Sequence, residues 1–148
     1  MRVVIQRCKY ASCTVDGEVV SKINKGFLCL VGFKEGDTFK DVELLAKKTA
    51  GMRIFEDENQ KMNLSLNDVN GQILAISQFT LYADCKRGNR PSFTEAMNYN
   101  KAIEFYDVYC QALQGYNINV LKGKFGSDMK IELLNDGPVT IILDSEDL

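Results

Sequence analysis

Short stretches of alternating or continuous apolar residues recur along the chain and predict a fold rich in strands. Residues 12–15 and 18–23 flank Asp16-Gly17, a dipeptide that favours the tight turn of a β-hairpin. Residues 27–31 are apolar throughout, as expected for a strand that is buried on both faces. The pattern predicts further strands at residues 2–6, 52–55, 72–81, 118–120, 129–133 and 139–143.

Two segments instead show the apolar spacing of helices. Asp37 is expected to open the first helix, Gly51 can end it, and its buried stripe consists of Val42, Leu45, Ala46 and Thr49. The second helix is predicted over residues 99–114, with Gly115 as its C′ residue and an apolar stripe of Tyr99, Ala102, Ile103, Tyr106, Cys110 and Leu113. Helices combined with many strands predict an α+β fold with a largely antiparallel sheet.

Length and composition restrict the class of protein further. A chain of 148 residues suits a single domain, and its net charge of −2 argues against a protein that coats nucleic acid through bulk positive charge. Histidine is absent, which excludes a Ser-His-Asp triad, a Cys-His pair and a histidine-ligated zinc site. Acid–base chemistry must therefore come from carboxylates, Lys, Tyr, Cys, backbone groups or the substrate itself.

The cysteines and the N-terminal sequence predict a cytoplasmic protein. There are five cysteines, an odd number, and no Cys-x-x-Cys pair, so we expect reduced thiols that mostly pack in the core. The first residues lack the long apolar region of a secretory signal. The longest apolar stretches are also far too short to span a membrane.

The first candidate for chemistry is Ser77-Gln78-Phe79-Thr80, at the polar end of an apolar strand. Alternation along the predicted strand 72–81 places Ser77 and Phe79 on one face, and Gln78 and Thr80 on the other. These groups are suited to donate hydrogen bonds to a carbonyl oxygen or an oxyanion. The alternative is a strand that emerges into solvent, with hydroxyl groups that cap loose backbone groups.

Two basic segments are candidates for contacts with RNA. Lys86, Arg87 and Arg90 lie in a loop that Pro91 stiffens, where they can hold phosphates or simply form a solvated turn. Phe125 stands between cations and glycines in residues 122–126. It can stack on a base, as in sites for single-stranded nucleic acid, or pack in the core.

The third candidate segment is residues 135–140, which contains Gly137-Pro138. The cis form of an X–Pro bond costs only about 0.5–1 kcal/mol, so this bond is a candidate cis peptide, and a plain trans turn is the alternative. A cis bond would turn two successive carbonyl oxygens the same way, where they can hold an ammonium group or block a side chain.

The order of these segments resembles the D-aminoacyl-tRNA deacylases of the D-tyrosyl-tRNA deacylase type. The resemblance covers nearly the whole chain and includes both signature motifs, S-Q-F-T at residues 77–80 and N-x-G-P-V-T at residues 135–140. It implies one domain over residues 1–148, with a barrel-like antiparallel or mixed sheet and two or three helices. It also implies a cytoplasmic homodimer, without metal or organic cofactor, whose active site lies at the subunit interface.

The implied reaction is hydrolysis of the ester that joins a D-amino acid to the 3′ terminal adenosine of tRNA. It releases the free D-amino acid and tRNA, and glycine mischarged on tRNA(Ala) is a second implied substrate. The implied site residues are Ser77, Gln78, Phe79 and Thr80 in the catalytic pocket; Gly137 and Pro138, which enter the partner subunit's site and reject L-aminoacyl groups; Arg7, which holds them; and Phe125 and Met129, near the terminal adenosine and the pocket wall. We assign Lys86, Arg87 and Arg90 to the tRNA backbone as a hypothesis.

Chemical reasoning favours water as the nucleophile. The ester is already activated, and the neighbouring ribose 2′-OH can assist, while N–H groups near Phe79 and Thr80 stabilise the oxyanion. The Thr80 hydroxyl lacks an evident base. Two alternatives stay open: a module that binds RNA ends without catalysis, and a hydrolase of another acyl ester with Cys85 or Thr80 as nucleophile.

Overall fold

The fold of residues 1–148, taken from a computed structural model, is built around one mixed sheet with six strands. The order is β2-β1-β3-β6-β7, and β8 pairs with β1 as well. The pairs β3–β6 and β6–β7 are parallel, and β1 is antiparallel to β2, β3 and β8. The strands are β1 (Arg2–Val15), β2 (Glu18–Ile23), β3 (Gly26–Gly32), β6 (Gln72–Ser77), β7 (Asn119–Lys122) and β8 (Lys130–Asp144).

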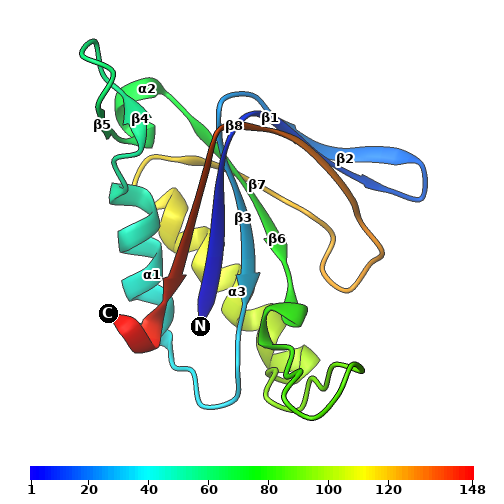
Figure 1. The fold of residues 1–148 in the computed structure, drawn as a ribbon. Helices are drawn as coiled ribbons and strands as arrows, with labels where there is room; N and C mark the ends of the chain where they lie inside the picture. Colours follow the sequence, from blue (N-terminus) through cyan, green and yellow to red (C-terminus); the bar gives the residue numbers. More distant parts are fainter.

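The long strand β1 makes the sheet curl. Its first half pairs with β3, its second half pairs with β2, and β8 runs along both halves. The hairpin of β1 and β2 therefore bends out of the plane of the other strands (Figure 1). This bend brings β2 against β6 and β7. The result is a sheet nearly closed into a barrel, which confirms the predicted α+β fold.

Two helices, α1 (Phe39–Gly51) and α3 (Tyr99–Gln114), pack against each other on one face of the sheet (Figure 1). Their beginnings follow from local sequence, because Thr38 and Asp41 form a capping box and the Asn98 side chain accepts a hydrogen bond from the Lys101 N–H. The smaller elements are α2 (Leu66–Val69), the hairpin of β4 (Phe55–Glu56) and β5 (Met62–Leu64), and the 3₁₀ helices η1 (Phe79–Tyr82) and η2 (Ser145–Asp147). No helix is both long and apolar enough to cross a membrane.

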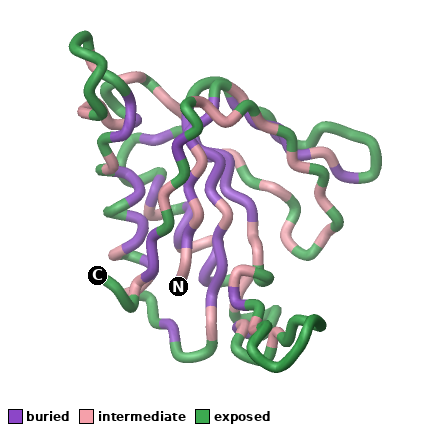
Figure 2. The backbone as a smooth tube through the Cα atoms, in the orientation of Figure 1, coloured by how far each residue is buried: buried purple, intermediate pink, exposed green.

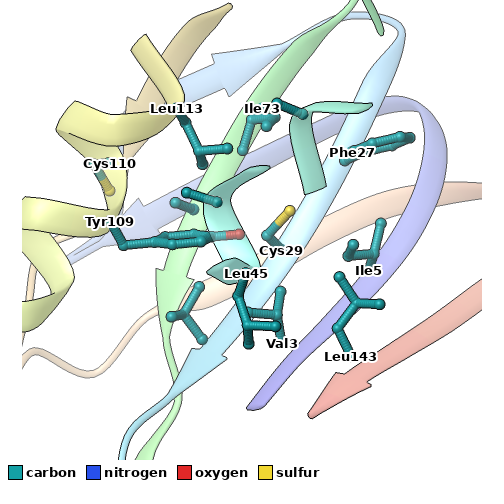
Figure 3. Close-up of a cluster of buried hydrophobic side chains, with 14 of the residues drawn as sticks. Val3, Ile5, Phe27, Cys29, Leu45, Ile73, Tyr109, Cys110, Leu113 and Leu143 are labelled. Carbon is teal, nitrogen blue, oxygen red and sulfur yellow. The ribbon is translucent and has the colours of Figure 1, made fainter. Parts of the chain in front are cut away.

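The main core lies between these helices and the sheet, where residues are buried on both layers (Figures 2 and 3). Tyr109 points into this core, and its hydroxyl is 2.9 Å from that of Thr49. Cys8, Cys13, Cys29 and Cys110 are buried and Cys85 is exposed, with no disulfide among them. Burial raises the pKa of the Cys8 thiol to about 11 and that of Cys110 to about 12, so both are neutral at pH 7.

The strand predicted over residues 72–81 is wrong at its end, because β6 stops at Ser77. Its neighbour β3 ends at Gly32, so the chain runs out of ladder partners and forms local bonds instead. The Leu81 N–H donates to the Gln78 carbonyl and the Ala83 N–H to that of Thr80. The expected alternation of residues 77–80 between two faces is therefore also wrong.

Other element ends shift for similar local reasons. Thr38 caps α1 in place of Asp37, whose carboxylate accepts from the Lys34 N–H before the helix begins. Gly115 is the C-cap of α3 with a right-handed φ of −62°, so it is not a left-handed C′ residue. The predicted strand 52–55 is reduced to β4, and the predicted strands 2–6 and 12–15 merge into β1, as 129–133 and 139–143 merge into β8.

Candidate functional site

A cavity of about 590 Å³ lies where β6, η1, the start of α3 and the loop between β7 and β8 meet. It brings together five of the residues singled out in the sequence: Ser77, Gln78, Phe79, Phe125 and Met129. The other lining residues are Ile76, Phe93, Ala96, Met97, Tyr99, Ala102, Gly126, Ser127, Asp128 and Ile131. The first signature segment and the glycine-rich segment after β7 therefore share one site.

The η1 turn presents its backbone at the edge of this cavity. Phe79 and Thr80 are the first residues of the turn, where helical N–H groups have no partner within the helix. The Gln78 N–H is already used, because it donates to the Val31 carbonyl at 2.7 Å. The Thr80 hydroxyl accepts a hydrogen bond from the Gln78 side-chain amide and does not line the cavity. The donors left free in this segment are thus the Phe79 and Thr80 N–H groups and the Ser77 hydroxyl.

Two aromatic pairs form much of the cavity wall. The Phe79 and Phe93 rings meet edge to face with centroids 5.1 Å apart, and the Tyr99 and Phe125 rings do the same at 5.2 Å. Gly126 has a φ of +80°, and a Cβ there would lie 2.6 Å from the Tyr99 hydroxyl oxygen, so only glycine lets Tyr99 lie against this loop.

Sequence reasoning placed Tyr99 in a core stripe, but its side chain is 57% exposed and lines the cavity. Helical spacing identifies one face of α3, yet it does not say that the first turn projects beyond the sheet. Phe93 was likewise not predicted to line a site. The signals that could have identified these two residues are the position of Phe93 beside the basic loop and that of Tyr99 at the start of a helix.

The cavity has little charge. Asp128 is the only carboxylate among the lining residues, and its partner Lys130 lies 3.1 Å away. No group of three or more Cys, Asp or Glu side chains is arranged to hold a metal ion. Lys86, Arg87 and Arg90 are exposed, and none of the three lines the cavity. The site offers shape, aromatic surface and backbone dipoles rather than a titrating side chain.

The second signature segment interrupts the pairing of β1 with β8. Between the pairs Gln6–Thr140 and Cys8–Asn135, β1 has only Arg7, whereas β8 has residues 136–139. This excess forms a bulge, here called the 136–139 bulge, in which Gly137 and Pro138 are exposed, Val139 is buried, and the Gly137–Pro138 peptide bond is cis.

Arg7 holds the bulge from inside the protein. Its side chain is buried, and it donates to the Asp136 carbonyl at 2.9 Å and to the Ile54 carbonyl at 2.7 Å. The Glu56 carboxylate lies 3.7 Å away. A Cβ on Gly137, whose φ is +131°, would lie 3.1 Å from the Arg7 guanidinium and 2.7 Å from a Val139 methyl group.

The bulge does not reach the cavity of its own chain. In the sheet, Arg7 is level with Phe27 on β3 and so with Ile73 on β6, whereas the cavity begins at Ile76. With neighbouring strands about 4.8 Å apart and a rise of about 3.3 Å per residue, the two features are roughly 20 Å apart along the sheet. Neither Gly137 nor Pro138 lines the cavity.

The family model for D-Tyr-tRNA(Tyr) deacylase matches residues 4–144. This chain belongs to that deacylase family. A D-aminoacyl-tRNA deacylase from Lactobacillus gasseri is 57% identical over 144 residues, covering 97% of this chain and 99% of the relative. A D-aminoacyl-tRNA deacylase from Fusobacterium nucleatum is 53% identical over 147 residues, covering 99% and 97%.

Solved structures share the fold of this chain. One titled c-Myc DNA Unwinding Element Binding Protein superimposes with a TM-score of 0.91 and 39% identity, and covers 97% of this chain and 98% of that one. A probable eukaryotic D-amino acid tRNA deacylase gives a TM-score of 0.82 at 16% identity, covers 96% and 97%, and supports the fold.

In this deacylase, Arg2 ties the far end of η1 to the ends of β1 and β8. Its guanidinium donates to the Leu81 carbonyl at 2.8 Å and to the Asp144 carboxylate at 2.9 Å, and lies 4.8 Å from the Tyr82 ring centroid. Burial raises the pKa of Asp144, but hydrogen bonds from the Glu146 N–H and Arg2 outweigh it, so the pKa is below its ordinary value.

We expect Arg2→Leu to lower the free energy of unfolding by about 1–2 kcal/mol, because it removes the side-chain donor of the Leu81 carbonyl and leaves the Asp144 carboxylate with only the Glu146 N–H. Urea denaturation at pH 7 measures this. The matched control is Lys130→Leu, whose exposed pair with Asp128 should contribute little.

The pH dependence gives a second check on the same variant. Because the folded pKa of Asp144 is lowered, its contribution is present above the ordinary value of 3.8 and is lost as the pH falls below it. The difference between Arg2→Leu and the unmodified protein should therefore shrink in acid; a constant difference down to pH 2 would argue against this assignment.

Proposed function

We propose that this protein hydrolyses the ester bond of D-aminoacyl-tRNA and releases the free D-amino acid and tRNA. The observation that carries the proposal is the cavity lined by Ser77, Gln78 and Phe79 of the first signature motif, in a member of this deacylase family. Its volume suits an amino acid together with part of a terminal nucleoside, as small-molecule sites of about 300–1,000 Å³ do.

Water is the nucleophile in the proposed reaction. It adds to the ester carbonyl carbon, the bond to the ribose oxygen breaks, and that oxygen takes a proton, with the neighbouring 2′-OH of the substrate assisting. The N–H groups of Phe79 and Thr80 stabilise the negative oxygen that develops on the carbonyl. This scheme is supported by a cavity with a single carboxylate, Asp128, and by a chain without histidine.

The terminal adenosine is proposed to bind beside Phe125 and Met129. Phe125 is held between the rings of Tyr99 and Tyr106, so it offers a pre-positioned aromatic surface for a base. Met129 supplies an adaptable apolar wall. Lys86, Arg87 and Arg90 form an exposed basic loop that is suited to contact phosphates near the RNA end.

Selection between mirror-image substrates is assigned to Gly137 and Pro138 of a second copy of the chain. Gly137 and Pro138 are exposed, yet they lie roughly 20 Å from their own cavity by the strand spacing, so only another copy can bring them to the site. The exposed Leu134 and Ile142, 48% and 64% exposed, flank the bulge on β8 and are suited to pack between two copies. The proposed enzyme is therefore a homodimer with interface sites.

The bulge would act by exclusion of the wrong enantiomer. A discrimination of about 10³ to 10⁴ between enantiomers requires roughly 4–5.5 kcal/mol of differential transition-state binding. A fixed main-chain wall provides this when an L side chain collides with it and a D side chain points into open space. Glycine has no side chain to collide, so glycine on tRNA(Ala) is proposed as a second substrate. The proposed location is the cytoplasm, where charged tRNA is used, and no cofactor is needed.

Deacylation of matched D- and L-aminoacyl-tRNA tests the proposal directly. We expect release of the D-amino acid at least about 10³ times faster than of the L-amino acid, measured as kcat/KM. Tight binding of the charged tRNA without release of amino acid would instead establish an RNA-end binding module.

Replacement of Gly137 should weaken discrimination between the enantiomers. In Gly137→Ala the new Cβ meets Val139 and the Arg7 guanidinium, so the bulge must shift, and the L to D ratio of kcat/KM should rise by about tenfold or more. The control is Gly17→Ala, which has a φ of +80° but open space around the Cβ. Equal ratios in the two variants would remove the bulge from stereoselection.

The activity of a Thr80 variant distinguishes attack by water from attack by a side chain of the protein. Thr80→Val keeps the shape but removes the hydroxyl, and we expect kcat to stay within about fivefold of the original, because backbone groups carry the proposed stabilisation. Alkylation of the exposed Cys85 should likewise leave kcat unchanged. A loss of about 10³ in either case would assign the nucleophile to that side chain.

The basic loop is tested through salt dependence. Each phosphate contact on a single strand contributes about 0.7 to the slope of log(kcat/KM) against log salt, so removing Lys86, Arg87 and Arg90 together should reduce the slope by about 2. Lys40, Lys47 and Lys48 on α1 provide a control with the same change in charge. An unchanged slope in the loop variant would exclude these contacts.

A further inference from the structure

The side chain of Gln6 joins the two ends of the 136–139 bulge. Its Oε1 atom accepts a hydrogen bond from the Asn135 side-chain amide at 2.6 Å and a second from the Thr140 hydroxyl at 2.6 Å. Asn135 is the residue before the bulge and Thr140 is the residue after it. One oxygen atom therefore fixes the separation between the points where the chain leaves and re-enters the ladder.

Asn135 extends this connection into the bulge itself. Its Oδ1 atom accepts from the Val139 N–H at 3.4 Å, and Val139 directly follows Pro138. Gln6, Asn135 and Val139 thus form a continuous chain of hydrogen bonds from β1 to the residue beside the proposed wall. A movement of the Gln6 side chain would shift Asn135. Through the hydrogen bond between Asn135 and the Val139 N–H, it would also shift the adjoining Pro138.

Gln6 and Arg7 hold the bulge from opposite faces of β1. Adjacent residues in a strand point to opposite faces, and here the Arg7 side chain is buried and binds the Asp136 carbonyl, while Gln6 binds Asn135 and Thr140. The inner contact binds the start of the bulge, and the outer contact joins its two ends. Together they bind the residues on both sides of Gly137 and Pro138.

The ladder between β1 and β8 does not need this side chain. Residues 2–6 pair with residues 140–144, and residues 11–14 pair with residues 130–133, so the strands are joined on both sides of the interruption by backbone groups. The bonds of the Gln6 side chain act only at the interruption, which is where the proposed function requires precise placement.

We propose that Gln6 is a positioning residue for stereoselection, in that its Oε1 atom sets the placement of Gly137 and Pro138 against the substrate bound by a second copy. This inference rests on the proposed function. It assigns Gln6 no contact with the substrate, and the effect passes through Asn135 and Thr140. Loss of the oxygen should therefore admit L-aminoacyl groups more than it slows cleavage of D-aminoacyl groups.

The experiment compares Gln6→Leu with Gln6→Glu in the full-length protein. Leu keeps a similar size and removes the acceptor, whereas the Glu carboxylate keeps oxygen acceptors for both donors. We expect Gln6→Leu to raise the L to D ratio of kcat/KM by about tenfold or more, with kcat for the D-aminoacyl-tRNA within about threefold of the original. Gln6→Glu should retain the original ratio.

Thr140→Val provides a second variant, because it removes one of the two donors and leaves Gln6 in place; we expect a smaller rise in the same ratio. Thermal unfolding verifies that each variant is folded. If Gln6→Leu is folded and its ratio is unchanged, or if both substrates slow equally, the inference is overturned and the proposed function stands. If the unmodified protein does not prefer the D substrate, both are overturned.

Discussion

The structure depends on the mismatch between β1 and β8, in which Arg7 alone stands opposite residues 136–139. A regular ladder between these two strands would pair the main chain throughout and leave no exposed main-chain segment at this point. Because the ladder resumes on both sides, the extra residues form a bulge in which Val139 packs in the core and Gly137 and Pro138 are exposed. The buried Arg7 guanidinium donates to the Asp136 carbonyl within the interruption and to the Ile54 carbonyl outside it.

A lack of backbone hydrogen-bond partners also explains where the cavity forms. The parallel strand β6 ends at Ser77 where β3 ends, and the chain closes into η1 rather than continuing as an edge strand. The turn presents backbone N–H groups beside aromatic walls formed by the Phe79–Phe93 and Tyr99–Phe125 pairs. A site of this kind supports a reaction in which the substrate brings its own activated bond and its own hydroxyl group, and it needs no titrating side chain of the protein.

The 136–139 bulge and the cavity differ in their surfaces and lie apart in one chain. One is an exposed, fixed piece of main chain, and the other is an open, mostly apolar cavity with little charge. Within one chain they lie roughly 20 Å apart by the strand spacing, so a function that uses both needs two chains. The exposed apolar residues of β8 beside the bulge, Leu134 and Ile142, are consistent with that requirement.

The sequence by itself determined the α+β class, the hairpin at Asp16-Gly17, the helix at residues 99–114 and the two motif segments, because periodicity and turn residues are local signals. Tertiary structure decided the rest. Only the end of β3 terminates β6 before Phe79, only the packing of α3 leaves Tyr99 exposed at a cavity, and only the register of β1 with β8 puts Gln6 between Asn135 and Thr140. These outcomes depend on partners distant in sequence, which no local pattern encodes.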